Sequence, residues 1–281
     1  MSLPISLIRF TNKIFPPVVH PFNLQNDGVK TYAEWQYEKG ADTVQFFANR
    51  YPSSVMFEGK RVLDMGCGAA GKSLYYASMG AAHVTGVEIV GHYEEEAEAL
   101  AGKLGLKDRF TFHLGSADAL PFEDGSFDTI IMNDFMEHTS DPEATLKEAL
   151  RLLAPEGRIY INFPPYGHPY GAHMSDLLNM PWVHCFFSEH NLCLAYRELA
   201  KTVPDGEQRV EFRMKQAESG KWEIAYINKM SLRRFQGILK TLNVQPEYYE
   251  EVPLRGFLSV LAKFPLTREK FVRMAVCVIK K

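Results

Sequence analysis

The segment RVLDMGCGAAGKS, residues 61–73, restricts the fold more than any other part of this 281-residue chain. An apolar, strand-like run ends in three glycines, Gly66, Gly68 and Gly71, which have the spacing G-x-G-x-x-G, and a helix-like run follows them. Glycines with this spacing after a strand let the backbone approach a nucleotide closely. The segment therefore predicts the first strand, turn and helix of a nucleotide-binding α/β domain.

The residues that follow continue to alternate between strand-like and helix-like patterns. We expect strands at 61–67, 83–89, 109–115, 126–134 and 156–163, and helices at 72–79, 93–105 and 141–153. Asp141 is a good N-cap for the last of these helices, and Pro142 suits its first position. The alternation predicts a Rossmann-like, doubly wound and mostly parallel sheet with helices on both faces.

The alternation stops after residue 163 and resumes near residue 230. We expect a helix at 230–241 and two more strands at 246–254 and 273–280, which complete a seven-stranded sheet. A parallel sheet binds its ligands outside the carboxyl ends of its strands, so an insertion after the fifth strand would form a cap over the substrate. The expected parts are therefore an N-terminal arm with helices that cover the cofactor (1–58), a cofactor-binding core (59–163), a substrate-site cap (164–228) and a C-terminal completion of the sheet (229–281).

Composition excludes several other classes of protein. The formal net charge is −3 and no basic stripe is present, which argues against a nucleic-acid partner. Four cysteines without disulfide or zinc spacing are typical of reduced thiols in a cytoplasmic protein. No apolar run reaches the roughly 18 residues of a transmembrane segment. Prolines and basic residues break the apolar N-terminus, which we expect to pack on the domain as an arm; weak association with a membrane surface is the alternative.

The glycine loop alone leaves two cofactor classes open, dinucleotides and S-adenosylmethionine. Asp64, two residues before the first glycine, would repel a pyrophosphate and attract the cationic end of S-adenosylmethionine. An aspartate that only caps the loop is the alternative. Glu88, at the end of the second strand, can accept hydrogen bonds from both ribose hydroxyls, a feature that enzymes using NAD share. Asp118, next to Ala117 in the loop after the third strand, is the candidate partner for the exocyclic amine of adenine, and an ordinary turn residue is the alternative.

Four motifs occur together in the order VLDMGCGAAG, VTGVE, ADALPFEDGSFDTIIMNDFMEH and LKEALRLLAPEGRIYINF. In this order they resemble class I S-adenosylmethionine-dependent methyltransferases, most closely the small-molecule branch that includes the ubiquinone and menaquinone C-methyltransferases. The resemblance covers residues 61–163. One departure is the pair Ala69–Ala70, where the family often has a further acidic or small polar residue.

The resemblance implies a set of cofactor-binding residues. Asp64, Gly66, Cys67 and Gly68 would line the methionine end of the cofactor, Glu88 and Ile89 would hold ribose and adenine, Ala117 and Asp118 would face the adenine edge, and Asn133 would contact the amino-acid portion. A helix that precedes the first strand often closes the cofactor from solvent in this fold. Trp35, with Tyr32 and Tyr37, is placed to do so in the segment 32–40, unless these aromatics only pack in the core.

Methyl transfer from a sulfonium needs mainly in-line positioning and the exclusion of water, and a base only when the nucleophile arrives protonated. Candidates for that base are His138, with Asp134 and Glu137, after the fourth strand, and His168 and His173 after the fifth. A structural role is the alternative for each of them. The spacing of His168, His173, His184 and His190 matches no known ligand set, so we expect no metal.

The expected cap suggests the chemistry of the acceptor. Its start, NFPPY at 162–166, resembles a signature of amino methyltransferases that act on DNA bases or glutamine, but here it follows the fifth strand instead of the fourth. The cap is rich in aromatic residues, namely Tyr166, Tyr170, Trp182, Phe186 and Phe187. They predict either an aromatic or partly apolar small-molecule acceptor or simply the core of the cap itself.

The sequence therefore predicts a methyltransferase that moves a methyl group from S-adenosylmethionine to a small molecule. Two alternatives remain. A catalytically silent relative could bind the cofactor or a partner and act as a regulatory subunit. An NAD-dependent oxidoreductase is disfavoured by Asp64 and by the lack of a recognisable hydride site.

Overall fold

The computed structural model describes residues 3–20, 23 and 30–281. The chain divides into two compact units, which we call the sheet unit and the helical unit. The sheet unit comprises Lys30–Phe163, Arg233–Glu251 and Ala275–Lys281, and the helical unit comprises Met1–Val29, Pro164–Leu232 and Val252–Met274. The N-terminal segment thus belongs with the residues that follow the fifth strand, whereas residues 30–58 belong with the sheet.

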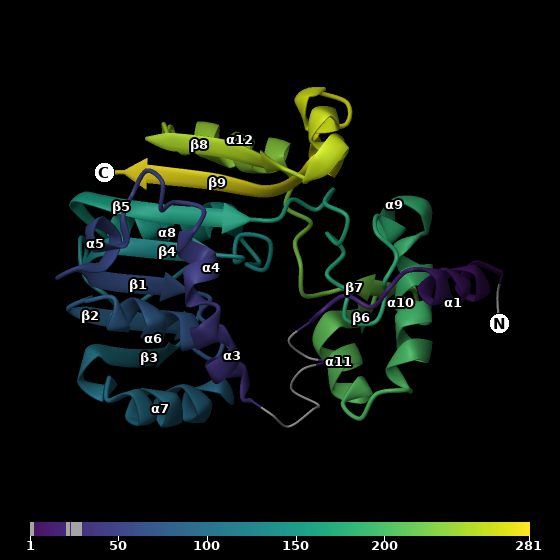
Figure 1. The fold of residues 1–281 in the computed structure, drawn as a ribbon, viewed down its shortest axis with the longest axis horizontal. Helices are drawn as coiled ribbons and strands as arrows, with labels where there is room; N and C mark the ends of the chain where they lie inside the picture. Colours follow the sequence, from purple (N-terminus) through teal and green to yellow (C-terminus); the bar gives the residue numbers. More distant parts are fainter. Residues whose placement is uncertain (1–2, 21–22, 24–29) are drawn as a thin grey trace. The chain divides into compact units, whose positions relative to one another are not determined.

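The sheet has seven strands in the order β3-β2-β1-β4-β5-β9-β8 (Figure 1). Their bounds are β1 Arg61–Met65, β2 His83–Glu88, β3 Phe110–Leu114, β4 Phe127–Asn133, β5 Leu153–Phe163, β8 Tyr248–Pro253 and β9 Val272–Lys280. The five strands from β1 to β5 pair in parallel, and β9 pairs antiparallel with β5. The predicted fold class, a doubly wound and mostly parallel seven-stranded sheet, is confirmed.

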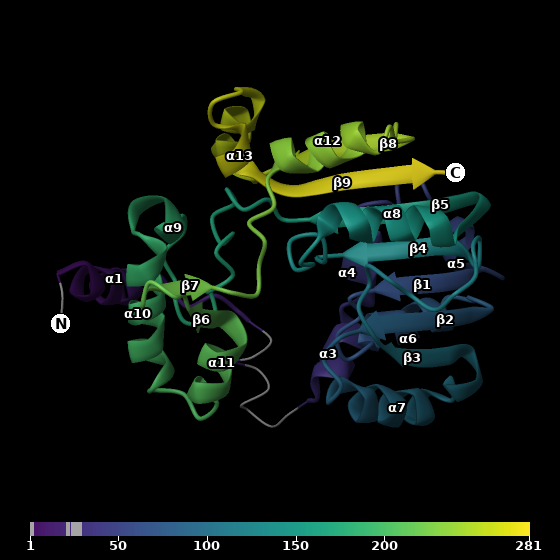
Figure 2. The ribbon, with the colours of Figure 1, turned by 180° about the vertical axis from the view of Figure 1, so that it is seen from behind.

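Helices cover both faces of this sheet. The helices are α3 Tyr32–Glu38, α4 Gly40–Val44, α5 Ser53–Phe57, α6 Gly71–Ser78, α7 Tyr93–Leu104, α8 Pro142–Leu152 and α12 Leu232–Thr241, with the short 3-10 turn η1 Lys107–Arg109. Helices α4 and α5 lie in front of the strands in Figure 1, and α8 and α12 lie in front of them in Figure 2. The central strands β1, β2, β4, β5 and β9 are mostly buried, which is why they read as nearly continuous apolar runs, whereas the edge strands β3 and β8 are only partly buried.

Local signals in the sequence determine where the helices begin and end. The Asp141 carboxylate accepts hydrogen bonds from the backbone N–H groups of Glu143 and Ala144, and Pro142 occupies the first helical position of α8, as predicted. Thr31 and Glu34 form a reciprocal capping box at the start of α3. Gly105 ends α7 in the left-handed conformation, with a φ of 68°.

Helix α3 packs closely on α6, and one glycine makes this approach feasible. A Cβ atom added to Gly71 would lie 2.0 Å from the carbonyl oxygen of Ala33 and 2.6 Å from the backbone nitrogen of Tyr37. Both neighbours are backbone atoms that cannot turn away. The third glycine of the loop is therefore required for contact between helices.

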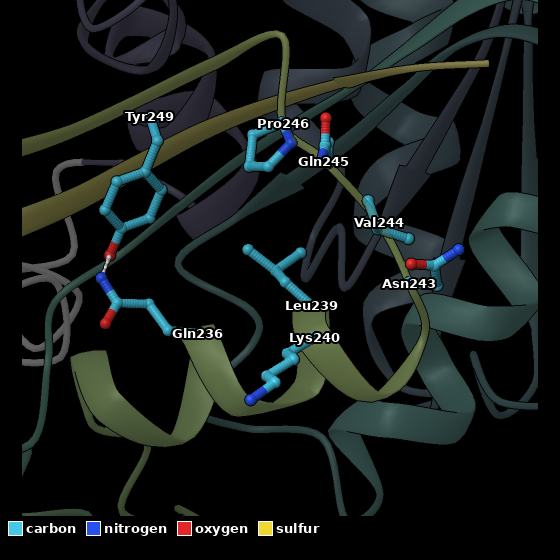
Figure 3. A pocket seen from close by; sticks show the side chains of 8 residues that line it. All are labelled: Gln236, Leu239, Lys240, Asn243, Val244, Gln245, Pro246 and Tyr249. Atoms are coloured by element: carbon cyan, nitrogen blue, oxygen red, sulfur yellow. Dashed lines mark hydrogen bonds between the residues drawn. The ribbon is translucent and has the colours of Figure 1, made fainter.

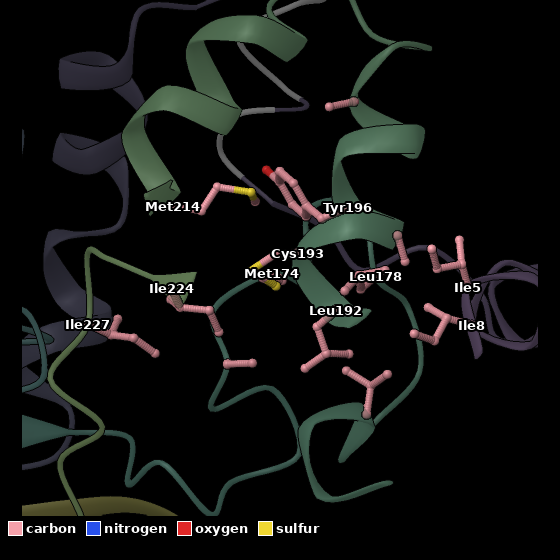
Figure 4. Packing of buried hydrophobic residues seen from close by; sticks show 14 residues of the cluster. Ile5, Ile8, Met174, Leu178, Leu192, Cys193, Tyr196, Met214, Ile224 and Ile227 are labelled. Atoms are coloured by element: carbon pink, nitrogen blue, oxygen red, sulfur yellow. The ribbon is translucent and has the colours of Figure 1, made fainter. Parts of the chain in front are cut away.

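The helical unit has a hydrophobic core of its own (Figure 4). Its elements are α1 Leu3–Ile14, α9 Val183–Phe186, α10 Glu189–Ala200, α11 Gly206–Arg213, β6 Met214–Gln216, β7 Trp222–Ile224, η2 Gly256–Lys263 and α13 Arg268–Phe271. Buried side chains from α1, such as Ile5 and Ile8, pack with Leu192 and Tyr196 of α10. Sequence analysis did not anticipate α10 and α11, because the polar residues of this stretch hide their helical period.

A buried ionic cluster crosses the core of the helical unit. Asp176, Arg209 and Arg213 have almost no exposed side-chain surface. Arg209 lies 3.1 Å and Arg213 lies 3.2 Å from the Asp176 carboxylate, which also accepts a hydrogen bond from the Tyr196 hydroxyl at 2.6 Å. Asp205 forms a second ion pair with Arg209 at 2.8 Å. The two buried guanidinium groups are thus balanced by two carboxylates, as buried charges require.

Replacing Gly71 with alanine tests the close contact of α3 with α6. We expect Gly71→Ala to lower the free energy of unfolding by about 1–3 kcal/mol, because the new methyl group would force the two backbones apart. Gly237→Ala is the matched control, since Gly237 lies inside α12 with no atom near the added Cβ. That change should raise the free energy of unfolding by about 0.5–1 kcal/mol. Equal effects in urea unfolding would contradict the packing account.

Candidate cofactor and active site

The strand order reverses between β1 and β4, because β2 and β3 lie on one side of β1 and the later strands on the other. In open α/β sheets the ligand crevice lies at such a switch point, outside the carboxyl ends of the strands. Gly66 and Gly68 follow β1 there with φ values of 78° and 58°. A Cβ on Gly66 would lie 2.1 Å from the ring of Phe135, so this loop tolerates no side chain at its first glycine.

Carbonyls and side chains of the protein accept hydrogen bonds from five N–H groups of this loop, those of Gly66, Cys67, Gly68, Ala70 and Gly71. The N–H groups of Gly66 and Cys67 donate to the Val87 carbonyl at 2.9 and 3.1 Å. The N–H of Gly68 donates to Oε2 of Glu88 at 2.9 Å. The other oxygen of Glu88 accepts the backbone N–H groups of the next two residues, at 2.9 and 3.1 Å. Glu88 therefore fixes the glycine loop to the end of β2.

Asp64 lies on β1, the strand that pairs with β2, and its side chain is buried. Its Oδ2 atom accepts a hydrogen bond from the Ser73 hydroxyl at 2.6 Å. Burial raises the pKa of Asp64 to about 6, and the Ser73 hydrogen bond and the Lys72 ammonium oppose this rise in pKa. The carboxyl group therefore lies in an environment that favours an added positive charge.

Helix α3 adds a group that sequence analysis missed. Gln36 is buried, and its Oε1 atom accepts the backbone N–H of Gly71 at 3.2 Å. A Cβ on Gly68 would lie 2.9 Å from Nε2 of Gln36 and 3.5 Å from the ring of Tyr32. Tyr32 in turn stacks on Trp35, with ring centroids 6.0 Å apart. Gln36 and Tyr32 thus approach the glycine loop from the preceding helix. The role of Gln36 could not be predicted, because a single polar residue forms no pattern in the sequence.

Residues 66–73 also have the spacing G-x-x-x-x-G-K-S of a phosphate-binding loop, which the sequence reading did not consider. In this structure the groups that would bind phosphate have other partners. Lys72 Nζ lies 3.9 Å from Oδ2 of Asp134, the Ser73 hydroxyl donates to a buried carboxyl, and the N–H of Gly71 donates to a side-chain amide. A loop whose donors are already engaged by carboxylates and amides is a poor site for a triphosphate or pyrophosphate.

The other residues expected at the cofactor lie around the same edge of the sheet unit. Ile89 is exposed directly after β2, and Asn133 lies at the end of β4, where its Oδ1 accepts from Asn162 at 2.9 Å. Ala117 is buried and Asp118 is half-buried in the turn after β3. Burial raises the pKa of the Cys67 thiol, so this cysteine is present as a neutral, packed group.

The turn after β4 holds a buried acid. Glu137 is 2% exposed, and neither of its carboxyl oxygens has a hydrogen-bond partner in the described part of the chain. Burial raises its pKa well above the ordinary value, and the nearby Asp134 carboxylate raises it further. His138 Nε2 lies 3.9 Å from Oε1 of Glu137. Asp134 itself has a φ of 48°, which is uncommon for a residue with a side chain.

The two other candidate histidines belong to the helical unit. Nδ1 of His168 accepts the backbone N–H of Tyr170 at 3.2 Å, and burial lowers the pKa of His168 to about 4. His173 has a φ of 53°, and its carbonyl oxygen accepts hydrogen bonds from Arg213 and from the Tyr226 hydroxyl. A neutral His168 is therefore available over the whole physiological range, but as a weak base.

The aromatic residues of the expected cap have mixed environments. Tyr166 and Phe187 pack against the core of the helical unit. The Trp182 indole donates to the Lys270 carbonyl at 3.0 Å and its ring lies 5.4 Å from that of Phe271. Phe186 is exposed. Most of these aromatics therefore stabilise the helical unit itself.

A separate pocket of about 460 Å³ lies between α12 and the start of β8 (Figure 3). Its lining includes Gln236, Leu239, Asn243 and Tyr249. In the strand order β8 is four positions from β1. The pocket therefore does not belong to the glycine loop, and it contains no cluster of catalytic groups.

The segment that contains the glycine loop is similar to known proteins. Residues 63–161 match a family model described as a methyltransferase domain. A tocopherol O-methyltransferase of Arabidopsis thaliana is 37% identical over 102 residues, which are 36% of this chain and 29% of the relative. A norajmaline N-methyltransferase of Rauvolfia serpentina is 32% identical over 117 residues, which are 41% of this chain and 39% of the relative. The chain thus spans well under half the length of either relative.

Solved structures share the fold over most of the chain. An S-adenosylmethionine-dependent methyltransferase from Mesorhizobium loti superposes with a TM-score of 0.51 at 15% identity, covering 91% of this chain and 100% of that one. The cyclase SpnF superposes with a TM-score of 0.53 at 17% identity, covering 99% and 93%. At these identities the likeness establishes the fold of class I methyltransferases. Among the described helices, none is long and apolar enough to cross a membrane.

The buried Asp64 predicts a pH dependence of stability. Its pKa rises from 3.8 to about 6 on folding, so the folded state holds an extra proton between these values. This contribution is present at low pH and is lost as the pH rises through about 6. Asp64→Asn keeps the acceptor for Ser73 and removes the titration. Its effect on the free energy of unfolding should therefore be more favourable at pH 7.5 than at pH 4, by about 3 kcal/mol at most. Urea unfolding at both pH values measures the difference, and an effect independent of pH would contradict the burial argument.

Proposed function

We propose that this chain binds S-adenosylmethionine at the glycine loop and transfers its methyl group to a small molecule. The observation that carries the proposal is the pair of carboxylates at the switch point of the sheet. Glu88 holds the loop and can accept ribose hydroxyls, and the buried Asp64 favours a cationic ligand. The match of residues 63–161 to a methyltransferase domain supports the same function.

The engaged loop amides favour this cofactor over NAD. A pyrophosphate needs free N–H groups at the start of α6, and Gln36 already accepts the one from Gly71. A nucleoside that carries a sulfonium and an ammonium group instead needs carboxylates. The residues present therefore fit S-adenosylmethionine, with ribose held by Glu88, adenine near Ile89, Ala117 and Asp118, and the amino-acid end near Asp64 and Asn133.

Each protein group would have a distinct role in the reaction. Bound S-adenosylmethionine supplies an electrophilic methyl group on a positively charged sulfur. Glu88 orients the ribose, and Asp64 binds the cationic end of the ligand. Tyr32, Trp35 and Gln36 cover the loop from α3 and exclude water. No protein group needs to form a covalent intermediate, because the chemistry depends on position.

A protonated nucleophile would also require a base. Glu137 is the strongest candidate in the sheet unit, because it is buried without hydrogen-bond partners and its raised pKa makes it a better base than an ordinary carboxylate. His138, 3.9 Å away, is a second candidate. His168 and His173 remain candidates from the helical unit, although the low pKa of His168 makes it a weak base.

We propose an aromatic or partly apolar acceptor. The curated relatives named above methylate a tocopherol and an alkaloid, as their names state, and both names indicate small organic molecules. A quinone-type acceptor, which the resemblance to ubiquinone and menaquinone methyltransferases implies, is one member of this class. The identity of the atom that receives the methyl group, whether oxygen, nitrogen or carbon, depends on the acceptor and not on the cofactor site.

One observation favours a second candidate function. The cyclase SpnF has this fold over almost the whole chain, and its name describes a reaction other than methyl transfer. The alternative is thus a protein that keeps the cofactor site and serves another reaction or a regulatory role. Transfer of a labelled methyl group distinguishes the two: S-adenosylmethionine labelled on its methyl group is incubated with γ-tocopherol, a reduced quinone and an indole-alkaloid amine. Labelled product supports the methyltransferase; cofactor binding without any transfer supports the alternative.

Calorimetry tests the cofactor separately from the reaction. We expect S-adenosylhomocysteine to bind in the micromolar range and NAD and ATP not to bind. Glu88→Gln should weaken binding of S-adenosylhomocysteine by about 1.5–3 kcal/mol, the range for hydrogen bonds to a charged group. Tight binding of NAD would overturn the proposal.

Gly68→Val should abolish this binding, because the side chain would enter the space between the loop, Gln36 and the ligand. Gly59→Val is the control. Gly59 has a φ of 67°, close to the 58° of Gly68, but a Cβ added there meets no atom within 4 Å. Both variants carry similar backbone strain, and only Gly68→Val should lose the cofactor. If both bind normally, the loop is an ordinary turn.

Glu137→Gln tests the base. Because the pKa of Glu137 is raised, its active, charged form increases as the pH rises, and the single-turnover rate should increase with it. We expect the variant to be about 10²–10⁴-fold slower and to lose this pH dependence, with unchanged affinity for S-adenosylhomocysteine. His138→Gln is the matched variant of its neighbour. A full rate in Glu137→Gln would assign the carboxyl group a structural role.

A further inference from the structure

Helix α1 is held on the helical unit by one of its faces. Ile5 and Ile8 are buried in the core of that unit. The Asn12 side chain donates to the Leu177 carbonyl and accepts the backbone N–H of Asn179 at 2.9 Å. These residues follow one another at intervals of three or four, so they form one side of the helix.

The opposite side of α1 is also apolar, but it faces solvent. Leu3, Leu7, Phe10 and Ile14 are all exposed, and Leu3 is 82% exposed. Their spacing of four, three and four residues places them in a single stripe along the helix. At 100° per residue, this stripe lies on the side away from Ile8 and Asn12. A surface helix with a second apolar stripe is unusual, because its outer side normally carries polar residues.

The charged residues of α1 itself are of one sign, and one acid of the neighbouring helix α10, Glu198, lies near Arg9. Arg9 and Lys13 of α1 are both exposed, and residues 3–20 contain no acidic residue. The whole chain, by contrast, has a net charge of −3. An apolar stripe bordered by basic residues is complementary to a surface that combines hydrocarbon with negative charge.

A second segment of the helical unit also exposes apolar side chains close to basic residues. Phe257, Val260 and Phe264 are exposed along and just after η2, and Leu266, which follows, is 95% exposed. Phe257 itself is 85% exposed. Residues 254–270 contain four basic residues (Arg255, Lys263, Arg268 and Lys270) and one acid, Glu269. The Glu269 carboxylate accepts the backbone N–H of Leu232 at 3.1 Å, so it is engaged within the unit.

Large apolar side chains with nearly complete exposure mark an interaction surface. Basic residues border both segments, which favours an anionic lipid bilayer over an apolar protein surface as the occupant. Since none of the described helices is long enough to cross a membrane, the contact would be interfacial.

We propose that the helical unit docks on anionic membranes through the outer stripe of α1 and the segment Phe257–Leu266. The apolar side chains enter the boundary between headgroups and acyl chains, and Arg9, Lys13, Arg255 and Lys263 lie near the lipid phosphates. This inference stands independently of the methyltransferase reaction, because it depends only on the surface of the helical unit.

Sedimentation with unilamellar vesicles tests the proposal on the full chain. Vesicles of phosphatidylcholine with 30% phosphatidylserine should bind the protein, pure phosphatidylcholine vesicles should bind it much less, and added salt should weaken binding. Phe10→Glu and Phe257→Glu should each lower the partition coefficient at least about tenfold, because a charge replaces a buried apolar group. Lys13→Ala should lower it about fivefold, the loss expected for one basic residue at the surface.

Val55→Glu is the matched control, since Val55 is an exposed apolar residue of α5 in the sheet unit. It should leave vesicle binding unchanged, and thermal unfolding should show that all variants remain folded. Absence of binding to anionic vesicles would overturn the proposal, as would equal binding by wild type and Phe10→Glu. A dimer in light scattering that Phe10→Glu dissociates would also overturn it, because the stripe would then be a contact between two copies of the chain.

Discussion

The amide groups of the turn between β1 and α6 are the constraint on which the rest of the site depends. This turn has the glycines of a nucleotide loop, yet its N–H groups donate to Val87, Glu88 and Gln36. The N–H of Gly71, the first residue of α6, thereby has a partner inside the protein, and the nearby charges are mostly carboxylates. Such a loop provides close backbone approach without an anion site. That combination separates a sulfonium nucleoside from a dinucleotide more clearly than the glycine spacing does.

Helix α3 is the second part of this arrangement. It comes before β1 in the chain and approaches the loop closely enough that Gly71 can carry no side chain. The same contact places Gln36 and Tyr32 beside Gly68. The interface between α3 and α6 therefore determines both how these two helices pack and how the glycine loop is covered. Changes in α3 should affect both stability and cofactor binding.

The sequence predicted the sheet well, because strands β1 to β5 are apolar runs bounded by turn residues and α8 has the distinct start Asp141–Pro142. It also predicted which end of the sheet would carry Asp64 and Glu88, since parallel strands share a carboxyl edge. It did not predict Gln36, because a single glutamine in a short helix has no period. It missed α10, α11 and the cluster of Asp176, Arg209 and Arg213, because arginines at helical spacing look like a solvated face until tertiary packing buries them. The packing of α1 on the core formed by residues 164–232 is a non-local contact that no local pattern reveals.

A crystal structure of the protein with S-adenosylhomocysteine tests the central claim most directly. We expect the ribose hydroxyls to contact Glu88, the adenine to lie near Ile89 and Asp118, and the amino group of the ligand to lie near Asp64. Gln36 should still accept the N–H of Gly71 in the complex. A ligand bound elsewhere, or a loop that releases Gln36 and binds an anion at the start of α6, would contradict the account.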